Sequence, residues 1–360
     1  MKKILLISSE VMHYRASIYN YFTDMFKENG WEFIVRSDKL QKQNPHPLKF
    51  NFKEIPFNFS QYKKEIININ PDIVIVFLHL KNFITWQLVH WLKLKKIPIV
   101  YWNKGINLEV PNPFIRNQFF YYIHNICDRI ILYSSQEVEY IKMKNRHKIS
   151  IANNTLNYED FPDIKESKEE IKTEFGIPFE KVVLFVGRMR EVKKVDHVIA
   201  VFHSIKNENV GLVIVGDDMH QNISEKINKR NTIYLGEIYD PEHVKISKLF
   251  KMADIFCIPG DVGLGLNQAF YWGLPVITED GYQPPEIHYL INGRNGFIVP
   301  QDDLIKLKEK IMYLLENDKI RQKFSEDARY DILRNASINN MFMGFKHCVD
   351  SLSKLNNHSH

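Results

Sequence analysis

The sequence contains only three cysteines, Cys127, Cys257 and Cys348, and they lie far apart. An odd number of widely spaced cysteines supports neither a disulfide framework nor a cysteine-based metal site, and it indicates a reducing compartment. Hydrophobic residues make up 44% and charged residues 25% of the 360 positions, which are the values of a globular protein long enough for two domains.

Long apolar runs are also missing. No stretch of eighteen consecutive apolar residues occurs, so the sequence predicts no membrane-spanning helix. The first apolar run, Ile4-Leu5-Leu6-Ile7, is too short for the core of a secretory signal peptide and is typical of a buried first strand. Together these absences predict a cytoplasmic protein.

A strong excess of one charge is lacking as well. The 48 lysines and arginines against 43 acidic residues give a formal net charge of +5. This surplus is too small to indicate nucleic-acid binding, but it suits an anionic small ligand or an acidic membrane surface. No Gly-x-Gly-x-x-Gly follows the first predicted strand, which argues against a nicotinamide or flavin dinucleotide domain.

Strand and helix patterns alternate along the whole chain. In the first half, strands are expected at 3–7, 31–35, 72–77, 99–102, 129–133 and 148–152, and helices at 17–29, 60–69, 82–95, 113–126 and 135–144. In the second half, strands are expected at 181–186, 210–215, 232–235, 255–258, 276–278 and 296–299, and helices at 194–206, 243–252, 264–272, 302–316, 318–335 and 338–355. This alternation predicts an α/β protein with two parallel sheets and a domain boundary near 157–180.

A glycine-rich turn joins the apolar run at 253–258 to the predicted helix at 264–272. It contains three glycines, at 260, 263 and 265. Such a turn brings free backbone N–H groups and the positive end of the helix dipole to one point, and this arrangement binds phosphate. The same turn also occurs without any ligand, as an ordinary strand-to-helix connection.

A short basic loop follows the predicted strand at 181–186. The loop, 187–194, carries Arg188 and Lys193 and leads into a helix with a buried apolar face. Because open α/β sheets bind ligands at the carboxyl ends of their strands, we expect both cations to lie in a ligand-binding crevice.

Several of these segments resemble a known family. Gly187-Arg188-Met189 with Lys193 resembles the donor-site signature of family 4 retaining glycosyltransferases, which belong to the glycosyl transferases group 1. The stretch 253–276, Pro285-Glu286 and the stretch 292–300 are similar to the segments that follow it, so the resemblance covers about 180–335. It implies the GT-B fold: two Rossmann-like βαβ domains facing across a cleft, with a C-terminal helix crossing back to the first domain.

The resemblance also implies a division of labour. Residues 1–160 would form the acceptor-binding domain, and residues 161–336 the domain that binds the nucleotide-sugar donor. Residues 337–360 would form the crossover helix and a tail that return to the first domain. One departure is visible: the family usually carries two glutamates eight positions apart where this chain has Gly260 and Gln268. The donor sugar and the nucleotide base are therefore left open.

The activity implied is transfer of a sugar, with retention of configuration, from a nucleotide diphosphate sugar of the UDP or GDP type to a glycan or lipid-linked acceptor hydroxyl in bacterial surface polysaccharide synthesis. Arg188 and Lys193 would stabilise the leaving diphosphate, whose oxygen takes the acceptor proton, and no metal or other cofactor is expected. The residues expected to bind the donor are Gly187, Arg188, Lys193, Gly260, Asp261, Val262, Gly263, Leu264, Gln268 and Glu286. The diphosphate is expected on the backbone N–H groups of Val262, Gly263 and Leu264.

Acceptor contacts are expected from loops that follow strands of the first half. The candidates are His13, Tyr14, Arg15, His79 and Lys104. Tyr14 offers an aromatic face for a sugar and Arg15 a fork for phosphate, but packing and helix capping explain them equally well. His79 also fits an ordinary loop histidine. Glu286 either touches the donor sugar or caps a helix, and Asp217-Asp218 is expected to cap a turn rather than to bind metal.

The segment 82–96 combines aromatic residues with lysines at its end, which suits a helix lying against an acidic bilayer. The same pattern fits a helix that packs its aromatic rings into its own domain. Two other functions also remain open: a hydrolysing sugar-nucleotide epimerase, which would act without an acceptor, and a non-catalytic sugar-nucleotide-binding subunit.

Overall fold

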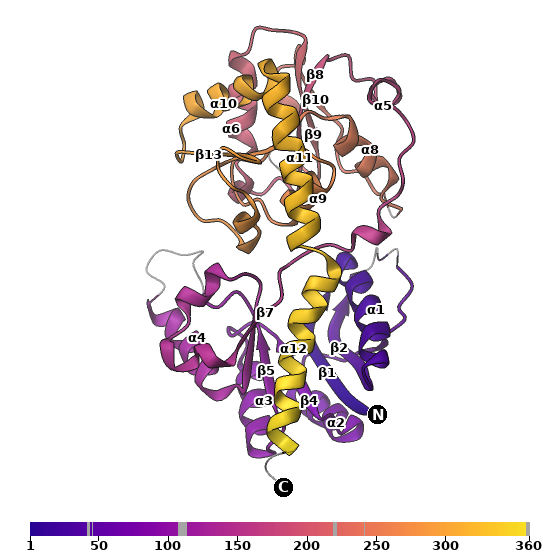
Figure 1. The fold of residues 1–360 in the computed structure, drawn as a ribbon, viewed down its shortest axis with the longest axis vertical. Coiled ribbons are helices and arrows are strands. Elements are labelled where there is room, and N and C mark those ends of the chain that lie inside the picture. Colours follow the sequence, from indigo (N-terminus) through magenta and orange to yellow (C-terminus); the bar gives the residue numbers. More distant parts are fainter. Residues whose placement is uncertain (42–43, 45, 107–113, 219–221, 241, 358–360) are drawn as a thin grey trace. The chain divides into compact units, whose positions relative to one another are not determined.

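The computed structural model describes the chain except for residues 42–43, 45, 107–113, 219–221, 241 and 358–360, and it contains two compact units (Figure 1). The first unit combines Met1–Asn157 with the segment that begins at Ile338, and the second unit is Tyr158–Ser337. The change of unit at 157–158 lies at the start of the range 157–180 expected for the boundary and three residues before the division expected at 160–161, and the last helix belongs to the first unit.

The sheet of the first unit is parallel throughout, with strand order β3-β2-β1-β4-β5-β6-β7. The strands are β1 (Lys2–Val11), β2 (Trp31–Leu40), β3 (Asn51–Glu54), β4 (Ile73–Phe77), β5 (Ile99–Trp102), β6 (Arg129–Leu132) and β7 (Ile149–Ile151). The central strands are buried on both faces, as continuous apolar runs require. The order of the strands reverses between β1 and β4, which places a ligand crevice beside the carboxyl ends of these two strands.

Helices cover both faces of this sheet. On one face α1 (His13–Glu28) and α12 (Ile338–Asn357) pack over residues such as Leu6, and on the other α2 (Phe59–Ile69), α3 (Phe83–Leu94) and α4 (Phe114–Ile126) pack over residues such as Leu5. Successive side chains of β1 point to opposite faces, so one strand supplies both cores. Within the described residues, every helix of the chain is too short or too polar to cross a membrane.

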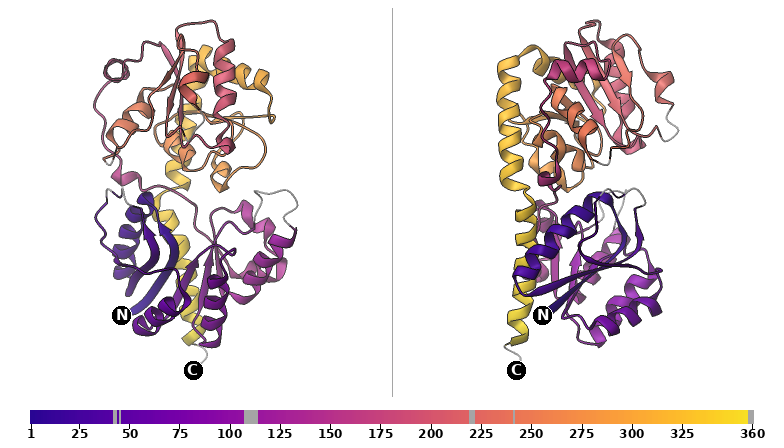
Figure 2. Two further views of the ribbon diagram at one scale, coloured as in Figure 1. Left: turned by 180° about the vertical axis from the view of Figure 1, so that it is seen from behind. Right: turned by 90° about the vertical axis from the view of Figure 1, so that its right-hand side faces the viewer.

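The last helix packs tightly onto the first unit. Helix α12 runs beside α1 (Figure 2). Aromatic rings join the two helices, with ring centroids 4.9 Å apart for both Phe22–Phe345 and Phe26–Phe342. Gly344 of α12 lies so close to β7 that a Cβ atom there would overlap the carbonyl oxygen of Ile151. The prediction that the C-terminal helix returns to the first domain is therefore confirmed.

The second unit is built around a six-stranded parallel sheet, with strand order β10-β9-β8-β11-β12-β13. The strands are β8 (Lys181–Val186), β9 (Val210–Val215), β10 (Thr232–Tyr234), β11 (Ile255–Cys257), β12 (Val276–Glu279) and β13 (Gly296–Val299). The helices are α5 (Lys168–Glu174), α6 (Val195–Ser204), α7 (Ile223–Lys226), α8 (Val244–Met252), α9 (Leu264–Tyr271), α10 (Leu304–Glu316) and α11 (Asp318–Asn335). The strand order reverses between β8 and β11, the two strands that precede the basic loop and the glycine-rich turn.

Two local expectations are wrong, and one helix was not expected. The helix expected at 135–144 is a pair of short 3-10 helices, because the buried Glu137 carboxylate accepts hydrogen bonds from the backbone N–H groups of Tyr133 and Ser134 and folds the chain into a turn. The unexpected helix is α5, which lies near the start of the second unit and begins with a capping box between Ser167 and Glu170. Helix α1 begins at His13 rather than at residue 17.

Candidate functional site

The basic loop after β8 and the glycine-rich turn after β11 pair with each other in the second unit. The backbone N–H of Gly260 donates to the Lys193 carbonyl (3.2 Å), and that of Asp261 donates to the Val192 carbonyl (2.9 Å). The Lys193 ammonium returns to the turn, where it contacts the Asp261 carbonyl oxygen and lies 3.3 Å from the Asp261 carboxylate. Residues almost seventy positions apart, which the sequence assigned to one site, are thus in contact.

This pairing requires glycine at position 260. A Cβ atom on Gly260 would overlap the carbonyl oxygen of Val192, a backbone atom that cannot move aside as a side chain can. No glutamate side chain is therefore compatible with the loops as they are paired here. The departure from the family pattern has a local cause, which is close backbone approach.

Lys193 is the most enclosed cation of this site, with its side chain 12% exposed. Burial lowers the pKa of its ammonium group below the ordinary lysine value, while the negative charges of Asp261 and Glu286 act in the opposite direction. Glu286 is buried and lies in the 3-10 helix Pro285–Tyr289. Among the predicted donor residues, Asp261 therefore contacts Lys193 directly, and Glu286 acts on its charge through space.

One of the backbone N–H groups predicted to bind the diphosphate already has a partner. The backbone N–H of Val262 donates to the side-chain oxygen of Gln283 (3.1 Å), so it is not available to a diphosphate in this structure. The Gln283 side-chain amide in turn donates to the Gly260 carbonyl (3.1 Å), the Thr278 hydroxyl (3.0 Å) and the Glu279 carbonyl (3.0 Å). Sequence reasoning missed Gln283, because a single glutamine between a glycine turn and two prolines carries no periodic signal.

The N-terminus of α9 remains the place where the turn can meet an anion. Gly263 precedes the helix with φ of 53°, in the left-handed region that favours glycine. A Cβ built on Gly263 would lie 3.7 Å from the Lys193 ammonium nitrogen, so this cation stands beside the start of the helix. A lysine charge and the positive end of a helix dipole at one point form an anion-binding arrangement. Gln268 follows one turn later in α9 and is half-buried.

Arg188 is exposed, in the loop directly after β8. Among the residues that the structure describes, no carboxylate lies within ion-pair distance of its guanidinium. Behind it, Gly187 is anchored by the bond from its N–H to the Val215 carbonyl (3.0 Å), and Met189 is buried. The loop is held by its neighbours, and the Arg188 side chain does not take part in holding it.

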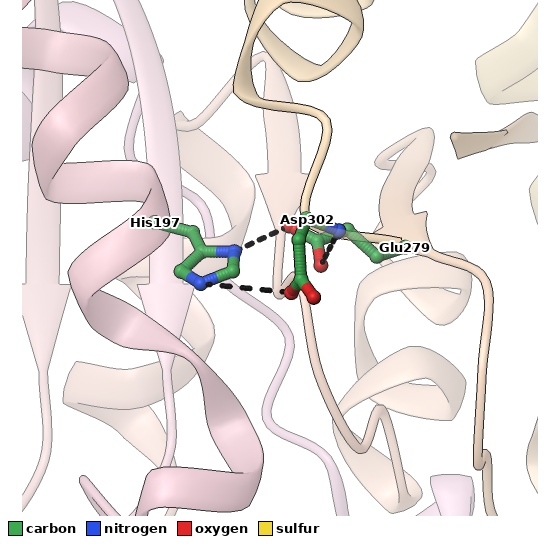
Figure 3. Close-up of side chains that lie close together, drawn as sticks. All are labelled: His197, Glu279 and Asp302. Carbon is green, nitrogen blue, oxygen red and sulfur yellow. Dashed lines mark hydrogen bonds and ion pairs between the residues drawn. The ribbon is translucent and has the colours of Figure 1, made fainter. Parts of the chain in front are cut away.

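A second charged group supports the basic loop. The ammonium of Lys194 contacts Glu279 (2.7 Å) and Asp302 (2.6 Å). His197 Nδ1 lies 2.6 Å from the other Glu279 oxygen, and Asp302 lies beside both residues (Figure 3). The ligand-type atoms of His197, Glu279 and Asp302 lie within 4.8 Å of one another, a spacing that could hold a metal ion. Because the Lys194 ammonium contacts both carboxylates, it supplies the positive charge of this group. The arrangement fixes the residue that follows Lys193 in the chain.

The expected role of Asp217-Asp218 is confirmed in part. The Asp218 carboxylate accepts a hydrogen bond from the backbone N–H of Ile223 (3.1 Å), the first residue of α7. This contact caps the helix N-terminus.

The five predicted acceptor residues separate into two groups in the first unit. His79 and Lys104 line a pocket of about 710 Å³. The other three residues, His13, Tyr14 and Arg15, do not line this pocket. They form the first turn of α1, which begins at His13.

Arg15 is an interior residue rather than an open phosphate fork. It is 3% exposed, its guanidinium donates to the Asn154 side chain (2.8 Å), and it stacks on the Trp102 ring at 4.8 Å. His13 Nδ1 lies 2.9 Å from the Gln41 side-chain oxygen. The Tyr14 ring makes an edge contact with the His13 ring.

Comparison with known structures shows which class of fold this is. A glycosyltransferase from Rickettsia africae superposes with a TM-score of 0.79 at 17% identity, covering 98% of this chain and 99% of that one. An Anabaena protein in complex with UDP superposes with a TM-score of 0.78 at 14% identity, covering 98% and 100%. The predicted GT-B fold, with two Rossmann-like parallel sheets and a returning C-terminal helix, is confirmed.

Sequence comparison relates the second unit to a known family. Residues 167–331 match the model of the glycosyl transferases group 1. An uncharacterised 41.2 kDa protein of Klebsiella pneumoniae, from its cps region, is 29% identical over 171 residues, or 46% of this chain and 45% of that protein. An uncharacterised glycosyltransferase of Methanocaldococcus jannaschii is 24% identical over 91% of this chain and 82% of its own. A capsular polysaccharide biosynthesis glycosyltransferase of Staphylococcus aureus is 23% identical over 64% of each.

Proposed function

We propose that the protein is a glycosyltransferase that takes a sugar from a nucleotide diphosphate sugar bound to the second unit and passes it to an acceptor hydroxyl bound to the first unit. The observation that carries this proposal is the position of the Lys193 ammonium beside the N-terminus of α9, where the strand order reverses in a group 1 domain. A diphosphate is the ligand that a helix N-terminus and a buried cation recognise together.

Two cations would act on the donor in different ways. Lys193, whose side chain is only 12% exposed and is held by Asp261, would fix the diphosphate at one place. Arg188 is exposed and has no carboxylate partner in the described part of the chain, so its charge is available to a second phosphate oxygen. The fold neighbour solved with UDP supports a nucleoside diphosphate as the ligand class.

The reaction needs little from the protein beyond position and charge. The bond between the sugar and the diphosphate breaks, and negative charge gathers on the leaving oxygen, where Arg188 and Lys193 stabilise it. The leaving oxygen accepts the proton of the acceptor hydroxyl, which forms the new glycosidic bond on the same face of the sugar. We propose retention of configuration on the family resemblance; relatives of Staphylococcus aureus and Bacillus subtilis named as alpha-N-acetylglucosaminyl- and alpha-glucosyltransferases support it. Neither a metal ion nor another cofactor has a part in this scheme.

We place the reaction in the synthesis of a bacterial surface polysaccharide. The capsular polysaccharide glycosyltransferase of Staphylococcus aureus and the protein from a cps region of Klebsiella pneumoniae support this assignment. The acceptor, a glycan or a lipid-linked sugar, would use the pocket that His79 and Lys104 line.

A donor screen with a product assay tests this function. UDP, GDP and ADP are titrated into the protein, and the one that raises the melting temperature identifies the nucleotide. Sugar nucleotides of that base are then supplied with a short-chain lipid-linked glycan, and the products are separated and their anomeric configuration measured. Transfer with retention, insensitive to chelator, supports the proposal. An altered or hydrolysed sugar nucleotide formed without acceptor indicates an epimerase, and tight binding without turnover on any acceptor indicates a non-catalytic subunit.

A further inference from the structure

The first unit contains a pocket at the point where its strand order reverses. The pocket, of about 710 Å³, begins at the carboxyl ends of β1, β4, β5 and β6 and is closed by α3 and α4. Its size lies in the range of pockets that enclose most of a bound small molecule, about 300–1,000 Å³.

One wall of the pocket is apolar and open to solvent. Phe83 of α3 is 73% exposed and Phe119 of α4 is 51% exposed, and both line the pocket. Trp86 also lines this wall, with its ring centroid 5.8 Å from that of Phe119. The indole N–H of Trp86 donates to the Leu80 carbonyl (2.9 Å), so the polar edge of the ring is satisfied and its apolar faces remain for packing. Large aromatic side chains gathered at an open rim mark a binding surface for an apolar group.

The remaining lining is cationic. Lys81 and Arg116 are exposed at the pocket, His79 and Lys104 lie beside them, and none of the described lining residues is acidic. In the part of the chain that the structure describes, neither Lys81 nor Arg116 has a carboxylate within ion-pair distance. The exposed charges of Lys81 and Arg116 favour an anion at this place.

We infer that this pocket binds an amphiphile in which a hydrocarbon chain is joined to a phosphate. The chain lies against Phe83, Trp86 and Phe119, and the phosphate meets Lys81 and Arg116. Resting on the proposed function, this inference assigns the acceptor to the lipid-linked class, with its phosphate held in the pocket. A free glycan can stack on an aromatic ring but carries no phosphate for Lys81 and Arg116, and a simple sugar phosphate has no hydrocarbon chain to cover the exposed Phe83 and Phe119 rings.

The pocket, rather than the whole surface of α3, carries this recognition. The sequence suggested that 82–96 could lie against a bilayer, but Trp91 packs against Phe59 with ring centroids 6.5 Å apart, and Lys93 pairs with Asp128. Leu94, which is 82% exposed, lies on the same helix and outside the pocket. The helix therefore presents no continuous apolar face to solvent. The exposed Leu94 serves as a matched control for Phe83.

The experiment measures binding of dodecyl phosphate to the full chain by isothermal titration calorimetry, below the micelle concentration of the probe. Dodecyl maltoside supplies the same chain without an anion, and inorganic phosphate supplies the anion without a chain. Phe83→Ser is compared with Leu94→Ser, and the double variant Lys81→Gln/Arg116→Gln with Lys64→Gln/Lys95→Gln, whose lysines are exposed elsewhere on the first unit. Melting temperatures confirm that all four variants fold.

We expect one dodecyl phosphate per chain, with Phe83→Ser and Lys81→Gln/Arg116→Gln each weakening binding roughly tenfold or more, the effect of about 1.4 kcal/mol. The two control variants should change binding by less than about twofold. Equal weakening by Phe83→Ser and Leu94→Ser, binding of dodecyl maltoside as tight as that of dodecyl phosphate, or no binding at all overturns the inference.

The same samples separate this inference from the proposed function. UDP and GDP are titrated in parallel, because the donor site lies in the second unit and none of the variants touches it. Nucleotide binding without dodecyl phosphate binding overturns the lipid-linked acceptor and leaves the donor site intact. Dodecyl phosphate binding without nucleotide binding overturns the donor site and leaves the pocket as a lipid phosphate site.

Discussion

Gly260 shows how a single position sets the geometry of the candidate donor site. Its missing side chain lets the glycine-rich turn approach the Val192 carbonyl, and this approach brings Asp261 to Lys193. The sequence predicted that Lys193 and the glycine-rich turn share a site, because both follow strands that meet at a crossover. It could not predict that Gln283 occupies the N–H of Val262, since that contact depends on the path of a loop twenty-one residues away.

A substitution of Gly260 tests this packing argument. Gly260→Ala should lower the free energy of unfolding by about 1–3 kcal/mol, because the added methyl group forces two backbone segments apart. Gly187→Ala is the control: its Cβ would make only ordinary contacts, the nearest at 3.9 Å, so its stability should change little. Denaturant unfolding of both variants measures the difference, and equal stabilities would contradict the close approach of the turn to Val192.

Loss of either cation should slow transfer. A charge about 4 Å from the leaving oxygen is worth up to about 4 kcal/mol at an effective dielectric constant of 20, and only part of this is specific to the transition state. We therefore expect Arg188→Ala or Lys193→Ala to reduce turnover by about 10²–10³-fold, with a smaller loss of donor affinity. Lys229→Ala removes an exposed lysine elsewhere in the second unit and should leave turnover unchanged. A well-folded Arg188→Ala variant with nearly full turnover would remove Arg188 from the site.

The pKa of Lys193 predicts a dependence on pH. Burial lowers this pKa, so the ammonium loses its charge at a pH below the ordinary lysine value of about 10.4. The kcat/KM for the donor should fall with rising pH from that lower value, since it reports the free enzyme. Stability should change in the opposite sense: between the folded and unfolded pKa values the unfolded chain binds more protons, so the Lys193 contribution to stability rises with pH.

The matched variant for this measurement is Lys193→Arg, because a guanidinium stays charged throughout the range. The alkaline decrease of kcat/KM should disappear or move to higher pH in this variant. A decrease at the same pH in both proteins would show that another group titrates.

At the scale of elements, the buried strands were predicted well from their apolar runs. Exposed elements, which lack such runs, were predicted poorly. The buried strands around β1 and β8 were expected within a few residues, because strands covered on both faces are nearly continuous in Val, Ile and Leu. The strand β3 was missed, since it lies at the sheet edge with mostly exposed polar side chains. The helix α5 was missed because its charged segment looks like a linker, and only the capping box of Ser167 and Glu170 marks its start.

The contact between α12 and β7 gives a prediction at this scale. Gly344→Ala should destabilise the protein by about 1–3 kcal/mol, because the new methyl group overlaps the Ile151 carbonyl and this outweighs a gain in helix propensity of up to about 1 kcal/mol. Met343→Ala, at an exposed position of the same helix, should stay within about 0.5 kcal/mol. Thermal or denaturant unfolding measures both, and a stabilised Gly344→Ala variant would mean that α12 does not pack on β7 in this way.

At the scale of the whole molecule, the two units share one sheet topology but place different residues where the strand order reverses. Each sheet reverses its strand order once, beside β1 and β4 in the first unit and beside β8 and β11 in the second. The second unit places a lysine and a helix N-terminus at that point, and the first unit places aromatic rings and cations there. In our proposals, the same physical rule places the anionic donor in the second unit and an amphiphilic acceptor in the first.

The most direct test of the account is the preference of the protein for a nucleoside diphosphate over the monophosphate. UDP and UMP, or GDP and GMP, are titrated into the natural sequence and into the double variant Arg188→Ala/Lys193→Ala. Because only the second phosphate distinguishes each pair, the ratio of the two Kd values reports the diphosphate contacts alone. We predict that the diphosphate binds roughly tenfold or more tightly to the natural sequence and that the double variant loses this preference. Equal binding of the two nucleotides to the natural sequence, or an unchanged preference in the double variant, would contradict the donor site proposed here.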